Sequence, residues 1–175
     1  MLIFRALFSP LETTMQLRSQ LSLASFLTIV TLAGDVALGQ GVPAARDIYM
    51  VYMGGNDCPP CVVWRSLELP KLRQSETFKS IRFTYVVKVI RSPVPPSFFL
   101  PEEVKPYKKK LDFASSGQGG SSQTAIIVDG EVYDYYYGYR TAAEVEQMIA
   151  AIRSGSQYPF NRCLKVNGYV CDVHG

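Results

Sequence analysis

The chain has 175 residues, of which 47% are hydrophobic and 19% are charged. This composition is that of a single globular domain with its own core, and it excludes a disordered or fibrous chain. The net charge of +3 comes from 18 basic and 15 acidic side chains, so no excess of positive charge indicates a nucleic-acid partner.

The first 39 residues have the layout of a secretory signal peptide. Arg18 precedes an apolar run from Leu21 to Gly34, and the small-residue ending Ala37-Leu38-Gly39 follows. The run is shorter than the roughly 20 apolar residues of a membrane-spanning helix, and Asp35 ends it. We therefore expect cleavage before Gln40.

An uncleaved membrane anchor is the alternative, because Val36 to Leu38 could extend the apolar run of a tilted helix. Met15 is an alternative start, since residues 1–14 add nothing to such a signal. Both forms place the domain outside the cytosol. The expected location is the bacterial periplasm, for either an exported protein or a membrane-anchored protein that faces the periplasm.

The first elements of the exported part are a strand, a helix and a second strand. The aromatic and apolar segment Asp47–Met53 is followed by a Gly-Gly-Asn-Asp turn, which predicts a buried strand. A helix is predicted from about Pro59 to Ser75, with Asp57 as its cap and a kink at Pro70. The β-branched, alternating stretch from Ile81 to Ile90 predicts the second strand.

A hairpin and a last helix are predicted after a proline-rich connection and a weak helix at residues 102–113. Asp129-Gly130 lies between two apolar runs, which is a strong hairpin signal. On the second hairpin strand we expect four tyrosines to share one face: Tyr133, Tyr135, Tyr137 and Tyr139. The capping box Thr141-Ala-Ala-Glu144 opens the last helix.

The motif Cys58-Pro59-Pro60-Cys61 lies where the first strand gives way to the first helix. Free N–H groups and the positive end of the helix dipole stabilise a thiolate there, so Cys58 is the predicted nucleophile and the more exposed thiol. Cys61, one turn further along, is the predicted resolving cysteine. The prolines leave the Cys61 amide as the main donor to the thiolate, whereas an ionised Asp57 opposes the ionisation of Cys58.

The order of strand, Cys58-Pro-Pro-Cys61, helix, strand, hairpin and helix resembles the thioredoxin-like superfamily. The resemblance implies an α/β fold for residues 40–155, a thioredoxin-like three-layer sandwich with a central mixed sheet of about four strands flanked by helices. Family members with a CPPC centre are often exported or membrane-tethered thiol-disulfide oxidoreductases. The resemblance therefore implies Cys58 and Cys61 as the catalytic pair, protein thiols or disulfides as substrates, a redox partner protein and no cofactor.

Three positions depart from the family pattern. The family usually has tryptophan before the first cysteine, whereas here Asp57 stands there and the single tryptophan is Trp64. The first strand carries no acidic residue, and the nearest carboxylate, Glu68, is expected on the surface. The position of the family's cis-proline reads Ser122-Gln123-Thr124, where we expect a trans peptide because a cis bond without proline costs about 2.5 to 4 kcal/mol.

Substrate contacts are expected from Pro59 and Pro60 of the motif and from Ser122 and Gln123. We expect Gln123 to lie close to both sulfurs and to help receive an extended substrate segment by strand addition. Its alternative role is that of an ordinary loop residue.

Residues 156–175 are predicted to form a tail that a Cys163–Cys171 disulfide closes as a hairpin. A two-residue turn at Asn167-Gly168 would place the two cysteines on different faces. A three-residue loop pairs Lys165 with Tyr169 and sets Cys163 across from Cys171, so we expect this register.

Two alternatives to a redox function remain open. Cys58, Cys61, Cys171 and His174 form a Cys3His set with spacings acceptable for zinc, although we expect no metal in an oxidising compartment. The second alternative is a non-catalytic binding module of thioredoxin-like fold, in which the Cys58–Cys61 disulfide is structural.

Overall fold

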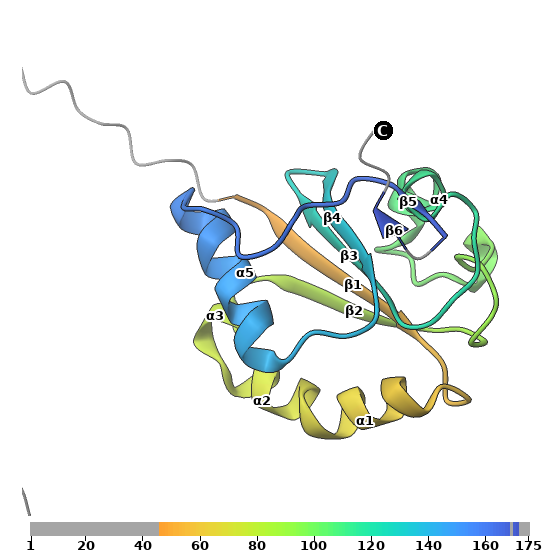
Figure 1. Ribbon diagram of the computed structural model, residues 1–175, viewed down its shortest axis with the longest axis horizontal. Helices are drawn as coiled ribbons and strands as arrows, with labels where there is room; N and C mark the ends of the chain where they lie inside the picture. The colour runs from red at the N-terminus through yellow and green to blue at the C-terminus, as the bar shows by residue number, and fades with distance from the viewer. Residues whose placement is uncertain (1–45, 169, 172–175) are drawn as a thin grey trace, which may run out of the picture. The chain divides into compact units, whose positions relative to one another are not determined.

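The computed structural model describes residues 46–168 and 170–171, and a four-stranded sheet lies at their centre (Figure 1). Its strands, in the order β2-β1-β3-β4, are β1 (Ile48–Gly54), β2 (Arg82–Val87), β3 (Gln123–Val128) and β4 (Glu131–Tyr137). Strand β1 runs parallel to β2 and antiparallel to β3. The predicted α/β fold with a mixed sheet of four strands is therefore confirmed.

Strand β1 is buried along its whole length and contributes to two separate cores. Its side chains alternate, so Met50 and Tyr52 pack on one face of the sheet whereas Tyr49 and Val51 pack on the other. This double burial explains why the segment reads as a nearly continuous apolar run.

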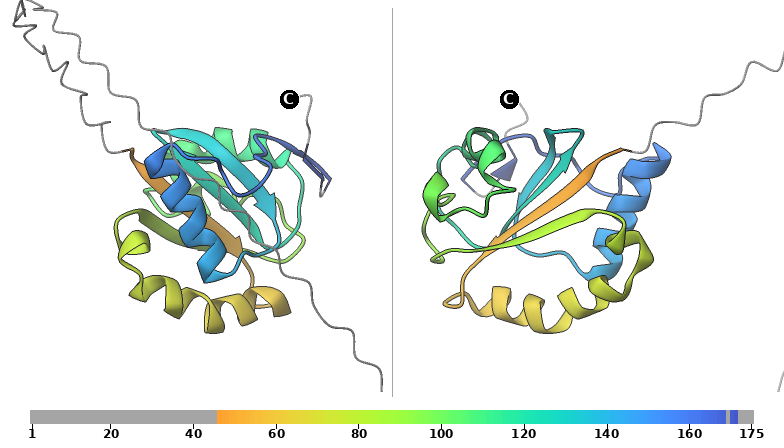
Figure 2. Two further views of the ribbon diagram at one scale, coloured as in Figure 1. Left: turned by 60° about the vertical axis from the view of Figure 1, so that its left-hand side comes forward. Right: turned by 180° about the vertical axis from the view of Figure 1, so that it is seen from behind.

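Helices cover both faces of the sheet (Figure 2). One face packs against α1 (Pro59–Leu67), α2 (Leu69–Gln74), α3 (Glu76–Lys79) and α5 (Ala142–Ser154). The other packs against the segment that holds η1 (Ser97–Phe99), η2 (Lys105–Tyr107) and α4 (Lys108–Ser115). The predicted capping box of α5 is present, because Thr141 and Glu144 exchange side-chain and backbone hydrogen bonds.

The predicted long helix breaks at Glu68, between α1 and α2. Pro70 has no N–H for the helix ladder and its ring would collide with the preceding turn, so the expected kink becomes a full break. Glu68 then accepts hydrogen bonds from Lys71 Nζ and from the Ala142 N–H, both at 2.8 Å. These two bonds lower the pKa of Glu68, and the bond from Ala142 ties the break to the start of α5.

A β-bulge places the tyrosines of β4 on both faces of the sheet. Ile126 pairs with Asp134 but Ile127 pairs with Val132, so Tyr133 is an extra residue in its strand. Tyr133 therefore packs beside the α5 core, whereas Tyr135 packs in the opposite core. The prediction that these tyrosines share one face is wrong, because the bulge shifts the alternation by one residue.

The tail returns to the edge strand β4 before it forms a short hairpin of β5 (Val166–Asn167) and β6 (Val170–Cys171). The Tyr135 N–H donates to the Cys163 carbonyl at 2.7 Å, and the Cys163 N–H donates to the Asp134 carboxylate at 2.9 Å. Asp134 is buried and also accepts from the Tyr158 hydroxyl at 2.9 Å. Burial raises the pKa of Asp134 despite these bonds.

The structure has a Cys163–Cys171 disulfide, but in neither of the two registers considered from the sequence. Val166 pairs with Cys171 and Asn167 with Val170, so Cys163 lies ahead of the hairpin and not across from Cys171. The physical reason is the bonding of Cys163 to β4, which places this cysteine independently of the hairpin ladder.

The predicted signal segment, residues 1–39, lies outside the described residues. Within residues 46–168 and 170–171, no helix combines the length and the apolar character that crossing a bilayer requires.

Removing the tail disulfide should destabilise the fold. The double variant Cys163→Ala with Cys171→Ala is expected to lower the free energy of unfolding by about 2 to 3 kcal/mol, because the bond removes loop-closure entropy from the unfolded chain. Urea unfolding followed by circular dichroism measures this change. Val170→Ala, at an exposed position of the same hairpin, is the control; equal stability of the double variant and this control would contradict the expectation.

Candidate active site

The CPPC turn joins the buried end of β1 to the first turn of α1. Cys58 is the N-cap of α1 and has extended backbone angles, and the two prolines occupy the first helical positions. Prolines are tolerated there because the first N–H groups of a helix have no intrahelical partner. The Cys61 N–H donates to Cys58 Sγ at 3.3 Å, which is the bond of an ordinary N-cap with sulfur as the acceptor.

Cys58 and Cys61 form a disulfide in which both residues are fully buried, each with 0% of its surface exposed. The expectation that Cys58 is the more exposed residue is therefore wrong for the disulfide form. The Cys58 sulfur is buried at the start of α1, where it accepts the Cys61 N–H, while Pro59 and Pro60 are exposed. An attacking thiolate must displace part of this cover to reach Cys58.

Gly54 is where the end of β1 contacts the disulfide. A Cβ atom at this position would lie 2.8 Å from Cε1 of Tyr52 and 3.1 Å from Sγ of Cys61. The ring of Tyr52 in turn stacks on Trp64, with centroids 4.1 Å apart and planes 8° from parallel. Trp64 is 1% exposed and donates from Nε1 to the Arg140 carbonyl at 2.7 Å, so its indole belongs to the core beneath the site.

Asp57 does not cap the helix, contrary to the sequence prediction. Its Oδ2 accepts a hydrogen bond from the Ile90 N–H at 3.1 Å, which ties the CPPC turn to the segment that follows β2. The cap is Cys58 instead, because its sulfur reaches the Cys61 N–H.

A buried lysine lies behind this turn. Lys88 is 5% exposed, and its Nζ donates to the carbonyls of Ser92 and Gly120, both at 2.5 Å. Burial lowers the pKa of Lys88 to about 8, while the nearby charge of Asp57 acts in the opposite direction. Two carbonyl acceptors match the two N–H groups of a neutral amine, so loss of the proton leaves both hydrogen bonds possible.

Ser121, which lies just before β3, contacts Cys61. Its Oγ lies 3.0 Å from Cys61 Sγ. Neither Ser121 nor Lys88 was predicted from the sequence. Lys88 does carry a signal, because it lies two residues after the buried Val86 and so on the same inward-facing side of the chain, where a lysine is unexpected. Nothing in the local sequence singles out Ser121 among its Gly/Ser-rich neighbours.

The structure places the expected substrate-binding residues Ser122 and Gln123 in the interior, 1% and 0% exposed. Ser122 Oγ donates to the Gly138 carbonyl at 2.8 Å. The Gln123 amide accepts from the Tyr135 hydroxyl at 3.0 Å and donates to the Tyr137 hydroxyl at 3.2 Å. These bonds engage both side chains within the fold. Of the four residues expected to contact a substrate, Pro59 and Pro60 are the two that are exposed.

The peptide bond between Ser121 and Ser122 is cis, so the expectation of a trans peptide before β3 is wrong. Two hydrogen bonds join Ser122 to Gly138. The Gly138 N–H donates to the Ser122 carbonyl at 2.9 Å, and the Ser122 hydroxyl donates to the Gly138 carbonyl.

The zinc alternative finds no ligand set in the part of the chain that the structure describes. No group of three or more His, Cys, Asp or Glu side chains lies close enough there to hold a metal ion. Cys58, Cys61 and Cys171 are all in disulfides, and His174 lies outside the described residues.

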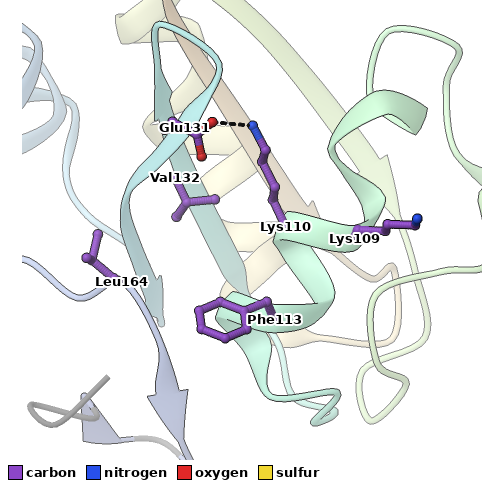
Figure 3. Close-up of a pocket in the computed structure, with 6 residues that line it drawn as sticks. All are labelled: Lys109, Lys110, Phe113, Glu131, Val132 and Leu164. Atoms are coloured by element: carbon purple, nitrogen blue, oxygen red, sulfur yellow. Dashed lines mark hydrogen bonds and ion pairs between the residues drawn. The ribbon is translucent and has the colours of Figure 1, made fainter.

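Pockets lie both beside and away from the CPPC turn. One of about 430 Å³ is lined by Val87, Lys88 and Val89 and by Asn56 and Asp57, the two residues that precede Cys58. Another, of about 340 Å³, lies between α4 and the start of β4, where Lys110 pairs with Glu131 at its rim (Figure 3). None of the residues that line this second pocket belongs to the CPPC turn.

Comparison with known proteins assigns no family to this chain. No protein-family model and no curated protein sequence matches it.

Reduction of the Cys58–Cys61 bond should change the fluorescence of Trp64, the single tryptophan. Trp64 follows Cys61 by one helical turn and stacks on Tyr52, which packs beside Gly54 and the disulfide. Emission spectra of oxidised and reduced protein measure the change. The variant Cys58→Ala with Cys61→Ala should show none, and an unchanged wild-type spectrum would mean that the stack does not sense the pair.

The free energy of unfolding should rise between about pH 8 and pH 10. Folded Lys88 loses its proton near pH 8, whereas an unfolded lysine keeps it to about pH 10.4, so in this interval the unfolded state binds more protons. Above this interval the unfolded tyrosines ionise first, because burial raises the pKa of Tyr52 to about 12, and stability falls again. Urea unfolding across this range measures the slope, and Lys88→Met should flatten it; a wild-type slope of zero would contradict the burial cost.

Proposed function

We propose that this chain is an exported thiol-disulfide oxidoreductase of thioredoxin-like fold that exchanges disulfides with protein substrates. The observation that carries the proposal is the position of Cys58, whose sulfur caps α1 and accepts the Cys61 N–H at 3.3 Å. A thiolate at this place gains a hydrogen bond and the positive end of the helix dipole. The order of strand, CPPC turn, helix, strand, hairpin and helix supports the thioredoxin-like fold.

The chemistry is a two-step exchange. A substrate thiolate attacks Cys58 Sγ, the Cys58–Cys61 bond breaks, and its electron pair passes to Cys61 Sγ. A second substrate thiolate then attacks the substrate sulfur of the mixed disulfide and releases Cys58 as a thiolate. Two substrate thiols thus lose two electrons and two protons as they form a disulfide, and the cysteine pair gains them. The same steps in reverse reduce a substrate disulfide.

The surface beside the turn favours protein substrates. Val87 and Val89 are 60% and 64% exposed and line the pocket next to Asp57. The same two valines also line a neighbouring pocket of about 340 Å³ that reaches Phe99, which is 65% exposed. An extended apolar segment of a protein would cover these side chains as its cysteine approaches Cys58.

Both disulfides support an oxidising location. All four cysteines of the chain are paired, Cys58 with Cys61 and Cys163 with Cys171. Such pairing persists in exported proteins and is rare in the cytosol. Together with the signal-like segment, it supports the periplasm as the location.

A non-catalytic binding module is the second candidate, and complete burial of both site cysteines favours it. In that case Cys58–Cys61 would act only as a structural staple of the turn. Reactivity in the folded state separates the two candidates.

The order in which the two disulfides react with mild reductant tests the proposal. A redox-active Cys58–Cys61 bond should open first, with the fold intact, although Cys171 is the more exposed cysteine. Pulse alkylation followed by peptide mapping should then label Cys58 before Cys61, because Cys58 is the stabilised thiolate.

A reductase assay on a small disulfide substrate completes the test. The variant Cys163→Ala with Cys171→Ala should keep wild-type activity, whereas Cys58→Ala should abolish it. Opening of the tail bond first, together with Cys58–Cys61 reduction only on unfolding, would establish the binding module instead.

A further inference from the structure

The two sulfurs of the Cys58–Cys61 disulfide have different hydrogen-bond donors. Cys58 Sγ accepts from the backbone N–H of Cys61, whereas Cys61 Sγ lies 3.0 Å from the hydroxyl of Ser121. A disulfide sulfur carries no proton, so in this pair the hydroxyl is the donor. Cys61 is 0% exposed, so solvent does not reach its sulfur in this form.

The Ser121 hydroxyl gains importance when the disulfide opens. Attack of a thiolate on Cys58 breaks the S–S bond and leaves the electron pair on Cys61 Sγ, inside the protein. A hydrogen bond to a thiolate is stronger than one to an uncharged sulfur. The hydroxyl therefore stabilises the leaving sulfur more than it stabilises the intact disulfide, and a better stabilised leaving thiolate departs faster.

Lys88 holds the segment that carries Ser121. Its Nζ donates to the Gly120 carbonyl, one residue before Ser121, and to the Ser92 carbonyl. The backbone before Ser121 also approaches the backbone after Lys88 closely. At Gly119, an added Cβ would lie 1.9 Å from the Arg91 carbonyl oxygen. Glycine at position 119 is what permits this approach.

The segment after β2, which includes Lys88 and Ile90, is also bonded to the CPPC turn. Asp57, directly before Cys58, accepts from the N–H of Ile90, and Lys88 lies two residues before Ile90. Hydrogen bonds and short stretches of backbone thus connect the two cysteines. They run from Cys58 through Asp57 and Ile90 to Lys88, and from there through Gly120 and Ser121 to Cys61.

We propose that the Ser121 hydroxyl stabilises the Cys61 thiolate when the disulfide opens, and that Lys88 is a positioning residue that holds Ser121 there through the Gly120 carbonyl. This inference rests on the proposed redox function. It assigns Ser121 as a catalytic residue, because it touches a reacting sulfur, and Lys88 as a residue that acts through Ser121.

The test is the rate at which glutathione opens the Cys58–Cys61 disulfide in the oxidised, folded full chain at pH 7. Ser121→Ala should slow opening by about three- to tenfold, because the leaving thiolate loses its hydroxyl donor. Ser121→Thr keeps a hydroxyl and should stay within about twofold of wild type. Ser97→Ala, at an exposed serine of η1, is the matched control and should have no effect.

Lys88 is tested by a double-mutant cycle. Lys88→Met should slow opening as Ser121→Ala does, and the two changes combined should be no slower than Ser121→Ala alone, because Lys88 acts through Ser121. A purely structural role would instead add to the effect of Ser121→Ala. If Lys88→Met does not fold, the comparison of Ser121→Ala with Ser121→Thr still decides the role of the hydroxyl.

The outcomes distinguish this inference from the proposed function. Wild-type protein that opens readily, with Ser121→Ala opening equally fast, would overturn the role of Ser121 and leave the oxidoreductase intact. Additive slowing in the cycle would overturn the role of Lys88. Wild-type protein that opens only on unfolding would overturn the oxidoreductase, and with it any leaving sulfur for Ser121 to stabilise.

Discussion

Burial of β1 on both faces is the constraint on which the rest of the structure depends. Each of its residues from Ile48 to Gly54 is buried, and alternate side chains belong to different cores. The strand therefore cannot shift along the sheet without moving both cores at once. Its last residue, Gly54, presents only backbone to Cys61, so the position of the disulfide follows directly from the position of the strand.

Two opposite charges, those of Asp57 and Lys88, lie beside Cys58 and line the same pocket. Asp57 next to Cys58 disfavours a thiolate, as the sequence already indicates. Lys88 lies close enough to Asp57 for the two charges to interact, and its own pKa is held near 8 by burial. Around neutral pH the lysine still carries its proton, so its positive charge opposes the effect of the aspartate on the Cys58 thiolate.

Local signals predicted the parts of the fold that local physics decides. Proline at the first helical positions, the capping box at Thr141 and the Asp129-Gly130 turn, where both residues have positive φ, all depend on a few adjacent residues. The features that were missed depend on long-range contacts. The bulge at Tyr133 changes which face a side chain meets, and the register of the tail hairpin follows from the bonding of Cys163 to β4.

The same division holds at the candidate site. The spacing and context of Cys58 and Cys61 are visible in the sequence, because strand, turn and helix follow one another there. Ser121 contacts Cys61 from 60 residues away along the chain, and Lys88 bonds to the neighbouring Gly120 carbonyl. Only the packing of β2 and β3 on either side of β1 brings these residues together. The burial of Cys58 was also missed, because its position in a turn suggests exposure.

The return of the tail to β4 also concerns how the molecule meets other molecules. An edge strand offers a row of backbone donors and acceptors on which a foreign strand can add, and this is a common route to aggregation. On β4 the Tyr135 N–H is taken by the Cys163 carbonyl and the Tyr133 carbonyl by Arg162 Nε, while Asp134 holds the Cys163 N–H. The disulfide between Cys163 and Cys171 holds the tail in this position. The tail therefore blocks the addition of a strand from a second copy to this part of β4.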